Sequence, residues 1–303
     1  MTRADLSPGQ QAAQCTHAAI DYQHAFPELA DAWRTNSNTV VLLETADESS
    51  LFELRSYLKS NGMPLVEVYE PDLGYEFTAL ALVRSTASGQ DPKLKSLSLM
   101  GKRPSSQYRL GTHAARVLAR MEETPQTDTQ TVLEHGWAVR TKLFELLDHL
   151  RYGTSLDDSW RLPEWVEEYR PELLAALPPD EVLHRYTVMH DCGKPFCLEY
   201  DEQGRKHFPD HAQVSYETYL RTWGDERVAN LILHDMDMHV CKAKDIPELA
   251  KVPDVAALML TSLAEVHANA AMFGGSESTS FKIKFKQIKK RGNALAKHLW
   301  RQS

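Results

Sequence analysis

The hydrophobic pattern of this chain changes its period near residue 105, and this change constrains the fold most. Before it, short apolar runs at residues 39–43, 65–69 and 77–83 have the length and composition of strands. From His113 onward, strand signals disappear and apolar residues recur at three-and-four spacing, which is typical of amphipathic helices. The expected helices lie at about 132–150, 179–191, 208–222, 225–240, 253–272 and 284–300.

These patterns predict two domains in a chain of 303 residues. A small α/β domain with its connector is expected over residues 1–105, and an all-α domain over residues 106–303. In the first domain, Ser7 followed by Pro8 predicts a helix start. Residues 85–110 are rich in Ser, Gly, Pro and Lys, so we expect a connector there, with one short strand at Leu94–Met100.

Charge is spread unevenly along the chain. The net charge of −8, taken as an average, disfavours a general binder of nucleic acid or anionic membranes. Residues 278–303, however, hold eight basic and no acidic residues, which leaves 26 basic against 42 acidic residues, or −16, in the rest. Within this basic segment, Lys282, Lys284 and Lys286 alternate with apolar residues, as in an extended segment with one cationic face. The pattern predicts contact with RNA or nucleotide phosphates; the alternative is a solvated helix face that offsets the acidic body.

Several sequence features favour a cytoplasmic protein without membrane contact. The longest apolar runs fall far short of the ~20 residues that a membrane helix needs. The N-terminus shows no basic segment followed by an apolar one, as a secretory signal would. The four cysteines form no CxxC pair, which is typical of free thiols in a reducing compartment.

Most of the thirteen histidines fall in the second half, several beside carboxylates. The strongest chemical signal is His190–Pro195, in which a His-Asp pair precedes Gly193 and Lys194. Imidazoles and carboxylates suit divalent transition metals, and an Asp adjacent to a His ligand can bridge two ions. The alternative is a set of histidines satisfied within the core. The candidate metal ligands are His135, His190, Asp191, His211, His234, Asp235 and Glu265, with His239 and His267 as spare candidates.

A metal held by these residues would activate water and polarise a phosphoryl oxygen. Lys194 follows His190 by four residues, so a continuing helix would place its ammonium group beside the metal. There it would neutralise the charge that develops on a phosphoryl group. We therefore assign catalytic roles to Asp191 and Lys194, and phosphate binding to Lys194 together with the lysines of the basic segment.

The order of these motifs over about residues 125–275 resembles the HD-domain metal-dependent phosphohydrolases. Within that superfamily it is most similar to the HD domain of bacterial tRNA nucleotidyltransferases and to RNA-repair HD proteins. The resemblance rests on HDxGK at 190–194, a second His-Asp pair, and Ser262–Glu265, where Glu265 replaces the family's Asp. It implies an all-α HD helical bundle, 2′,3′-cyclic phosphodiesterase or phosphatase activity, and one or two ions of Mn, Ni, Co or Fe.

Residues 1–85 resemble type 2 peptidyl-tRNA hydrolases, at Asp5–Ala19, at Glu70–Gly74 and at Thr78–Ala81. The resemblance implies a small α/β fold with a mixed sheet, and a surface for tRNA. The chain begins almost inside the family's first strand, so either that strand is truncated or the true start lies upstream. The candidate ligand residues are Gln10, Gln14, His17, Asp72 and Thr78.

Gln10 occupies the position of the catalytic Lys in that family. A Gln side chain cannot supply a cation that stabilises an oxyanion, and it is no proton donor for ester cleavage. We therefore expect this domain to grip tRNA or a related RNA rather than to cleave an ester; the alternative is a structural or partner-binding relic.

Together these features predict a metal-dependent phosphohydrolase that acts on RNA ends, with tRNA-like RNA as its partner. One alternative is a nucleotidase or phosphodiesterase for free nucleotides or a cyclic dinucleotide, with the N-terminal domain forming a homodimer. The other is an RNA-binding protein with a structural metal site. Neither a nucleotidyltransferase motif nor a P-loop is found, so we expect no addition of CCA and no phosphorylation of RNA ends.

Overall fold

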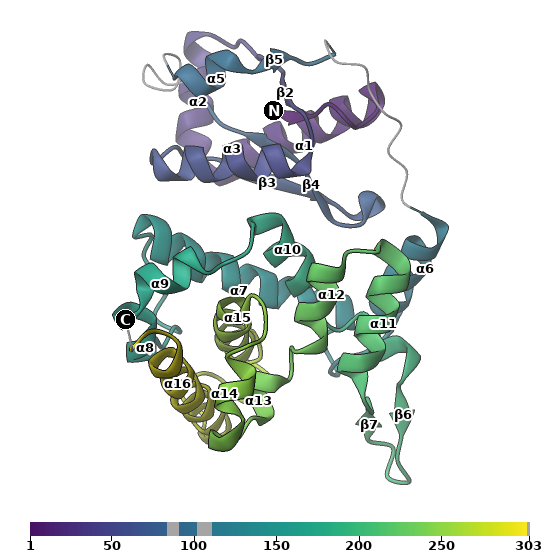
Figure 1. The fold of residues 1–303 in the computed structure, drawn as a ribbon. Coiled ribbons are helices and arrows are strands. Elements are labelled where there is room, and N and C mark those ends of the chain that lie inside the picture. The colour runs from purple at the N-terminus through teal and green to yellow at the C-terminus, as the bar shows by residue number, and fades with distance from the viewer. Residues whose placement is uncertain (84–90, 102–110, 302–303) are drawn as a thin grey trace. The chain divides into compact units, whose positions relative to one another are not determined.

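The computed structural model describes residues 1–83, 91–101 and 111–301. The chain divides into two compact units, Met1–Ala115 and Arg116–Ser303 (Figure 1). The expected boundary between residues 105 and 106 lies outside the described residues. Among the helices that the structure describes, none combines the length and the apolar composition needed to cross a bilayer.

The N-terminal unit contains a five-stranded mixed sheet with the strand order β3-β4-β1-β2-β5. Its central strand β1 pairs parallel with β2 and antiparallel with β4, which confirms the expected mixed α/β fold. The strands are β1 (Thr2–Arg3), β2 (Leu43–Thr45), β3 (Val66–Glu70), β4 (Glu76–Ala81) and β5 (Ser98–Leu99). The helices are α1 (Pro8–Ala25), α2 (Pro27–Asn36), α3 (Glu48–Ser60) and α5 (Pro92–Ser96), with a 3-10 turn η1 (Pro71–Leu73).

Local capping explains where the first helix begins and why one expected strand is mostly absent. Helix α1 starts at Pro8 because Ser7 forms a capping box with Gln10. The strand expected at Leu94–Met100 was wrong over most of its length, because Asp91 caps α5 by accepting a hydrogen bond from the Leu94 N–H. Only β5 remains of it as a strand.

The C-terminal unit is mostly helical, as expected (Figure 1). Helix α6 (Thr112–Glu123) leads into it from the N-terminal unit. Its helices are α7 (Val132–Tyr152), α8 (Glu164–Glu168), α9 (Arg170–Ala175), α10 (Asp180–Met189), α11 (His211–Trp223), α12 (Glu226–Leu233), α13 (Asp237–Val240), α14 (Ile246–Leu249), α15 (Val255–Ala268) and α16 (Thr279–Trp300). Two 3-10 turns, η2 (Lys194–Phe196) and η3 (Ala243–Asp245), and one hairpin of β6 (Glu199–Tyr200) and β7 (Lys206–His207) complete it.

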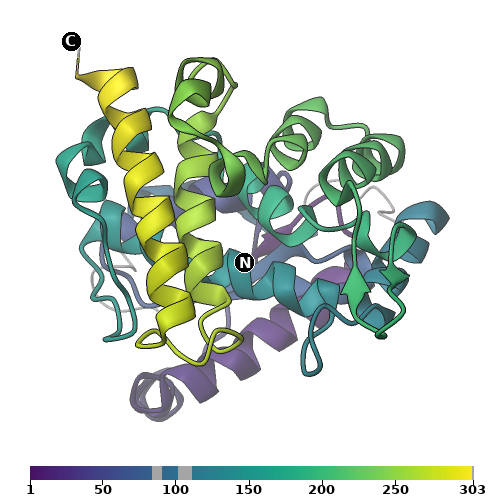
Figure 2. The same cartoon turned by 90° about the horizontal axis from the view of Figure 1, so that it is seen from below.

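Helix α7 occupies the centre of this unit and packs against both α10 and α15. The apolar face of α7 is fully buried at Leu143, Leu146 and Leu147. Helix α15 is buried along nearly its whole length, and α16 lies beside it (Figure 2). This arrangement brings α7, the end of α10 and α15 together, and these elements carry most of the candidate metal ligands.

The basic segment is helical at its start rather than extended, so the expectation of an extended Phe281–Lys286 was wrong. Ser278 caps α16 by accepting a hydrogen bond from the Phe281 N–H. The alternation of apolar and basic residues instead marks one edge of an amphipathic helix, because Phe281 and Ile288 lie buried on the face toward the bundle.

Candidate metal centre

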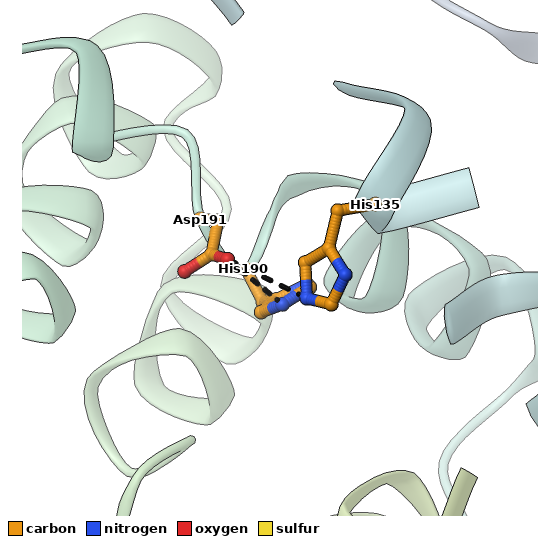
Figure 3. A group of neighbouring side chains, drawn as sticks. All are labelled: His135, His190 and Asp191. Carbon is orange, nitrogen blue, oxygen red and sulfur yellow. Dashed lines mark ion pairs between the residues drawn. The ribbon is translucent and has the colours of Figure 1, made fainter. Parts of the chain in front are cut away.

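Three buried side chains of the C-terminal unit converge on one point. His135 comes from α7, while His190 and Asp191 follow the last turn of α10 (Figure 3). One ligand atom from each lies within 4.8 Å of the others. Asp191 Oδ2 is 3.3 Å from His190 Nε2 and 3.7 Å from His135 Nε2. The structure thus brings together residues that are 55 positions apart in the sequence.

A glycine beside His135 lets the two helices that carry this trio approach closely. A Cβ on Gly136 would lie 2.2 Å from the carbonyl oxygen of Val188, so any side chain would force α7 and α10 apart. Upstream, Thr131 and Glu134 form a capping box that starts α7. The position of His135 relative to His190 therefore depends on a backbone contact that only glycine permits.

A second glycine shapes the turn after Asp191. A Cβ on Gly193 would lie 2.2 Å from the backbone nitrogen of Ser215 in α11. The Gly193 N–H donates a hydrogen bond to Ser215 Oγ over 2.9 Å, which holds the turn against that helix. The Gly of the HDxGK motif is thus required by packing.

The hydrogen bonding of the trio fits a metal ion. Both ring nitrogens of His135 and Nε2 of His190 are buried without a hydrogen-bond partner among the described residues. His190 Nδ1 lies 2.8 Å from the carbonyl oxygen of Thr187, to which it donates, so Nε2 is the ring nitrogen left to face Asp191. Two ligands about 2.1 Å from one ion lie roughly 3–3.6 Å apart at ordinary coordination angles, close to the separations observed here.

Two further carboxylates border the trio. Glu265 of α15 lies 3.8 Å from His135 Nε2, and its other oxygen lies 2.8 Å from Nε2 of His239. Asp235 is buried and accepts a hydrogen bond of 2.5 Å from the hydroxyl of Tyr186. Tyr186 was not among the expected site residues, because an isolated Tyr in a helix carries no ligand signal. With Asp191, these carboxylates offer oxygen ligands of the kind that divalent cations bind.

The charges of the centre shift the pKa values of its members strongly. Burial alone would lower the pKa of His190, but Asp191, Asp235 and Glu265 together raise it to about 10. Burial would raise the pKa of Asp191, yet Lys194 and His190 hold it well below its usual range. Burial raises the pKa of Asp235, and the nearby carboxylates add to this effect. The imidazole of His190 thus experiences a field that favours a positive charge at this point.

Lys194 and His211, which follow α10 in the sequence, both approach the carboxylate of Asp191. Lys194 lies in the turn η2 and not on a continuing helix, but its Nζ still reaches Asp191 Oδ2 over 2.6 Å. Its second partner is Gln126 Oε1, at 3.1 Å. His211 begins α11 and places Nε2 3.9 Å from Asp191 Oδ1, while its Nδ1 lies 3.1 Å from the carbonyl oxygen of Phe208.

Two other histidines make different contacts. His234 Nδ1 lies 2.7 Å from the carboxylate of Asp237, and its side chain is partly exposed at the end of α12. His239, which the sequence offered only as a spare candidate, contacts Glu265 instead. The short turn between α12 and α13 accounts for this difference, because it breaks the single helix expected over 225–240.

The second spare candidate, His267, has a packing role. Its ring stacks on Trp160 at 4.2 Å and meets Phe281 edge to face. Its Nδ1 lies 2.8 Å from the carbonyl oxygen of Leu263, and its Nε2 accepts a hydrogen bond from the backbone of Arg161. Burial lowers the pKa of His267 to about 4, so the ring is neutral and joins α15 to α16.

The candidate phosphate-binding lysines of α16 are exposed. Lys282, Lys284 and Lys286 all project from the surface of this helix. Lys282 pairs with Glu277 over 3.1 Å. Burial would lower the pKa of His239, but Glu265 raises it above its usual value, and the charge of Lys284 opposes this rise weakly.

In the N-terminal unit, the candidate residues fall into two groups. Gln10 serves the capping box, since its Oε1 accepts a hydrogen bond from the Ser7 N–H at 3.0 Å. Asp72 is exposed in η1. The other three are connected: Thr78 donates to Gln14 Oε1 over 2.8 Å, Gln14 donates to the carboxylate of Glu70, and His17 Nδ1 lies 3.5 Å from that carboxylate.

Replacing Thr78 by Val is expected to destabilise the N-terminal unit by about 1–3 kcal/mol, because the buried Gln14 Oε1 loses its donor. Urea denaturation measures the change. Thr35→Val is the matched control, since the Thr35 hydroxyl bonds the Asp31 carbonyl on the exposed surface of α2. Equal midpoints for the two variants would contradict a structural role for the Thr78–Gln14 bond.

The comparisons with known proteins concern the N-terminal unit. The family model described as Peptidyl-tRNA hydrolase PTH2 matches residues 2–98, about a third of the chain. No curated protein matches the chain, and no solved structure matches it either. Residues 99–303, which hold the whole candidate metal centre, lie outside the family match. Residues 2–98 thus form a domain similar to the peptidyl-tRNA hydrolases.

Proposed function

We propose that the C-terminal unit is a metal-dependent phosphohydrolase that acts on RNA ends as a 2′,3′-cyclic phosphodiesterase or phosphatase. The observation that supports this proposal most is the convergence of His135, His190 and Asp191, with the Nε2 atoms of both histidines buried and unpartnered among the described residues. Such orphaned nitrogens are costly in a core that serves stability alone.

The residues of the centre would have two roles, metal binding and charge stabilisation. His135, His190 and Asp191 would hold a divalent transition ion such as Mn, Ni, Co or Fe. When bound, the ion supplies Lewis-acid activation of water and of a phosphoryl oxygen. Lys194 holds the Asp191 carboxylate in place and brings an ammonium group to the site, where it can stabilise negative charge on the phosphoryl oxygens.

Two observations favour RNA as the substrate. The N-terminal domain is similar to peptidyl-tRNA hydrolases, and α16 presents exposed lysines that suit a phosphate backbone. We further propose that the N-terminal domain binds tRNA-like RNA without cleaving an ester. The position of the family's catalytic Lys holds Gln10, whose side chain caps α1, so no cation is supplied there.

The test is hydrolysis of 2′,3′-cyclic AMP and of an oligoribonucleotide ending in a 2′,3′-cyclic phosphate, by the full-length protein with Mn, Ni, Co or Fe. We expect turnover of both substrates, with at least one of these metals required. We also expect bulk tRNA to inhibit the hydrolysis of 2′,3′-cyclic AMP. Turnover without inhibition by tRNA supports the alternative of a free-nucleotide phosphodiesterase. No turnover with any metal, together with retained tRNA binding, supports an RNA-binding protein instead.

A further inference from the structure

The hairpin of β6 and β7 is joined at both ends to the candidate metal centre, although its middle extends away from the helices (Figure 1). The chain enters it from the turn η2, which carries Lys194, and leaves it toward His211 at the start of α11. Lys194 and His211 both contact Asp191. The hairpin thus lies in the sequence between two residues that contact Asp191.

The turn of the hairpin is held in one conformation by Asp201. Its carboxylate accepts hydrogen bonds from the backbone N–H groups of Gln203 and Arg205, and from the guanidinium of Arg205. His207 Nε2 adds a contact of 3.0 Å, and it is the largest of the effects that lower the pKa of Asp201 to about 2. A turn fixed in this way provides a preorganised surface.

One face of the hairpin alternates aromatic and cationic groups. Tyr200 is directly paired with Lys206 across the strands, so their side chains share a face. Phe208 follows Lys206 by two residues and continues that face toward the centre. The ammonium group of Lys194 lies 5.2 Å from the centre of the Phe208 ring. The order along this face is therefore Tyr200 and Lys206, then Phe208, then Lys194 beside Asp191.

Exposure distinguishes Tyr200 from a packing residue, because its ring is 60% exposed at a position where an aromatic ring gains nothing from the fold. Lys206 and Phe208 beside it are partly buried. The Lys206 ammonium group lies 3.9 Å from the exposed carboxylate of Asp128 in the loop before α7. Aromatic rings interleaved with cations suit unstacked nucleobases with their phosphates, whereas a duplex keeps its bases stacked on one another.

We propose that the β6–β7 hairpin binds the last unpaired nucleotides of a single-stranded RNA end, with a nucleobase stacked on Tyr200 and a phosphate at Lys206. This inference rests on the proposed function, since it supplies the substrate of the same centre. Phe208 and Lys194 then receive the terminal nucleotide and its phosphate. The substrate class is accordingly RNA with an unpaired 3′ end, and a fully base-paired end is a poor substrate.

Direct binding tests the hairpin independently of catalysis. Fluorescence anisotropy measures the affinity of the full-length protein for a labelled single-stranded hexaribonucleotide. We expect Tyr200→Ala to weaken binding about tenfold or more, the magnitude of one base–aromatic stack, and Tyr200→Phe to retain affinity within about twofold. We expect Lys206→Gln to reduce the slope of log Kd against log salt by about 0.7. Tyr152→Ala, at the far end of α7, is the matched control.

The outcomes separate this inference from the proposed function. Unchanged affinity in Tyr200→Ala, or equal weakening with a blunt-ended RNA duplex, would overturn the role of the hairpin. A wild-type protein that hydrolyses no phosphodiester with any metal contradicts the proposed function, whatever the binding result. Circular dichroism of Tyr200→Ala confirms that the variant is folded, so that a loss of binding is assigned to the ring itself.

Discussion

Replacing Asp191 by Ala is expected to abolish both metal binding and hydrolysis of 2′,3′-cyclic AMP, with a loss on the order of a thousandfold or more in kcat/KM. The carboxylate lies 3.3 Å and 3.7 Å from two buried imidazoles and pairs with Lys194. Its removal takes away a candidate ligand and leaves the ammonium group without its nearest counter-charge. Metal content by mass spectrometry and turnover of the cyclic nucleotide measure the two effects separately.

Asp158→Ala provides the matched control, because Asp158 is exposed in the segment after α7 and distant in sequence from the centre. We expect wild-type metal content and turnover in that variant. If Asp191→Ala keeps full phosphodiesterase activity, the centre is not catalytic. If it loses metal and stability but the wild type shows no turnover, the metal is structural.

Gly136→Ala is expected to cost about 3 kcal/mol or more of stability, because a Cβ there would meet the Val188 carbonyl oxygen at 2.2 Å. Neither partner can yield cheaply, since both belong to the backbones of packed helices. For a unit of this size, the change corresponds to a fall in Tm of roughly 6–12 °C. Differential scanning calorimetry of the full chain measures it.

The same variant is expected to weaken metal binding, because His135 precedes Gly136 and moves with α7. Gly9→Ala serves as the control, since a Cβ at Gly9 would meet nothing within 4 Å. We expect its Tm to stay within about 2 °C of the wild type, or to rise slightly, as Ala restricts the unfolded chain more than Gly. A Tm for Gly136→Ala equal to that of Gly9→Ala would contradict the close approach of α7 and α10.

Local sequence signals predicted the strong elements well. Ser7 and Pro8 located the start of α1, and apolar spacing located α7 and α15 to within a few residues, because such signals act over one or two turns of helix. The same local rules failed at the expected strand of residues 39–43, where β2 begins only at Leu43, at the expected strand Leu94–Met100, and at Phe281–Lys286. The alternating pattern at Phe281–Lys286 suits both a strand and one edge of a helix, and only burial against α15 selects the helix.

For the candidate centre, too, the sequence predicted some residues correctly as neighbours and left other contacts to the tertiary structure. Residue type and motif order identified His135, His190 and Asp191, which the structure brings within 4.8 Å of one another. They favoured His234 as a ligand and kept His239, five residues further on, only as a spare candidate. The turn that ends α12 directs one toward Asp237 and the other toward Glu265. Such a choice depends on where a helix breaks, and helix ends are set by tertiary contacts as much as by local sequence.

The sequence by itself determined which functional groups the candidate centre can contain. These are imidazoles, carboxylates and a lysine, in an order that resembles a metal site for phosphate substrates. It also determined the change from a mixed sheet to helices, since the hydrophobic period is a property of neighbouring residues in the sequence. Tertiary structure alone decided which of these groups meet, through the glycine contacts at Gly136 and Gly193. The physical reason is that a convergence of side chains from α7, α10 and α15 depends on packing distances between helices, which no local pattern encodes.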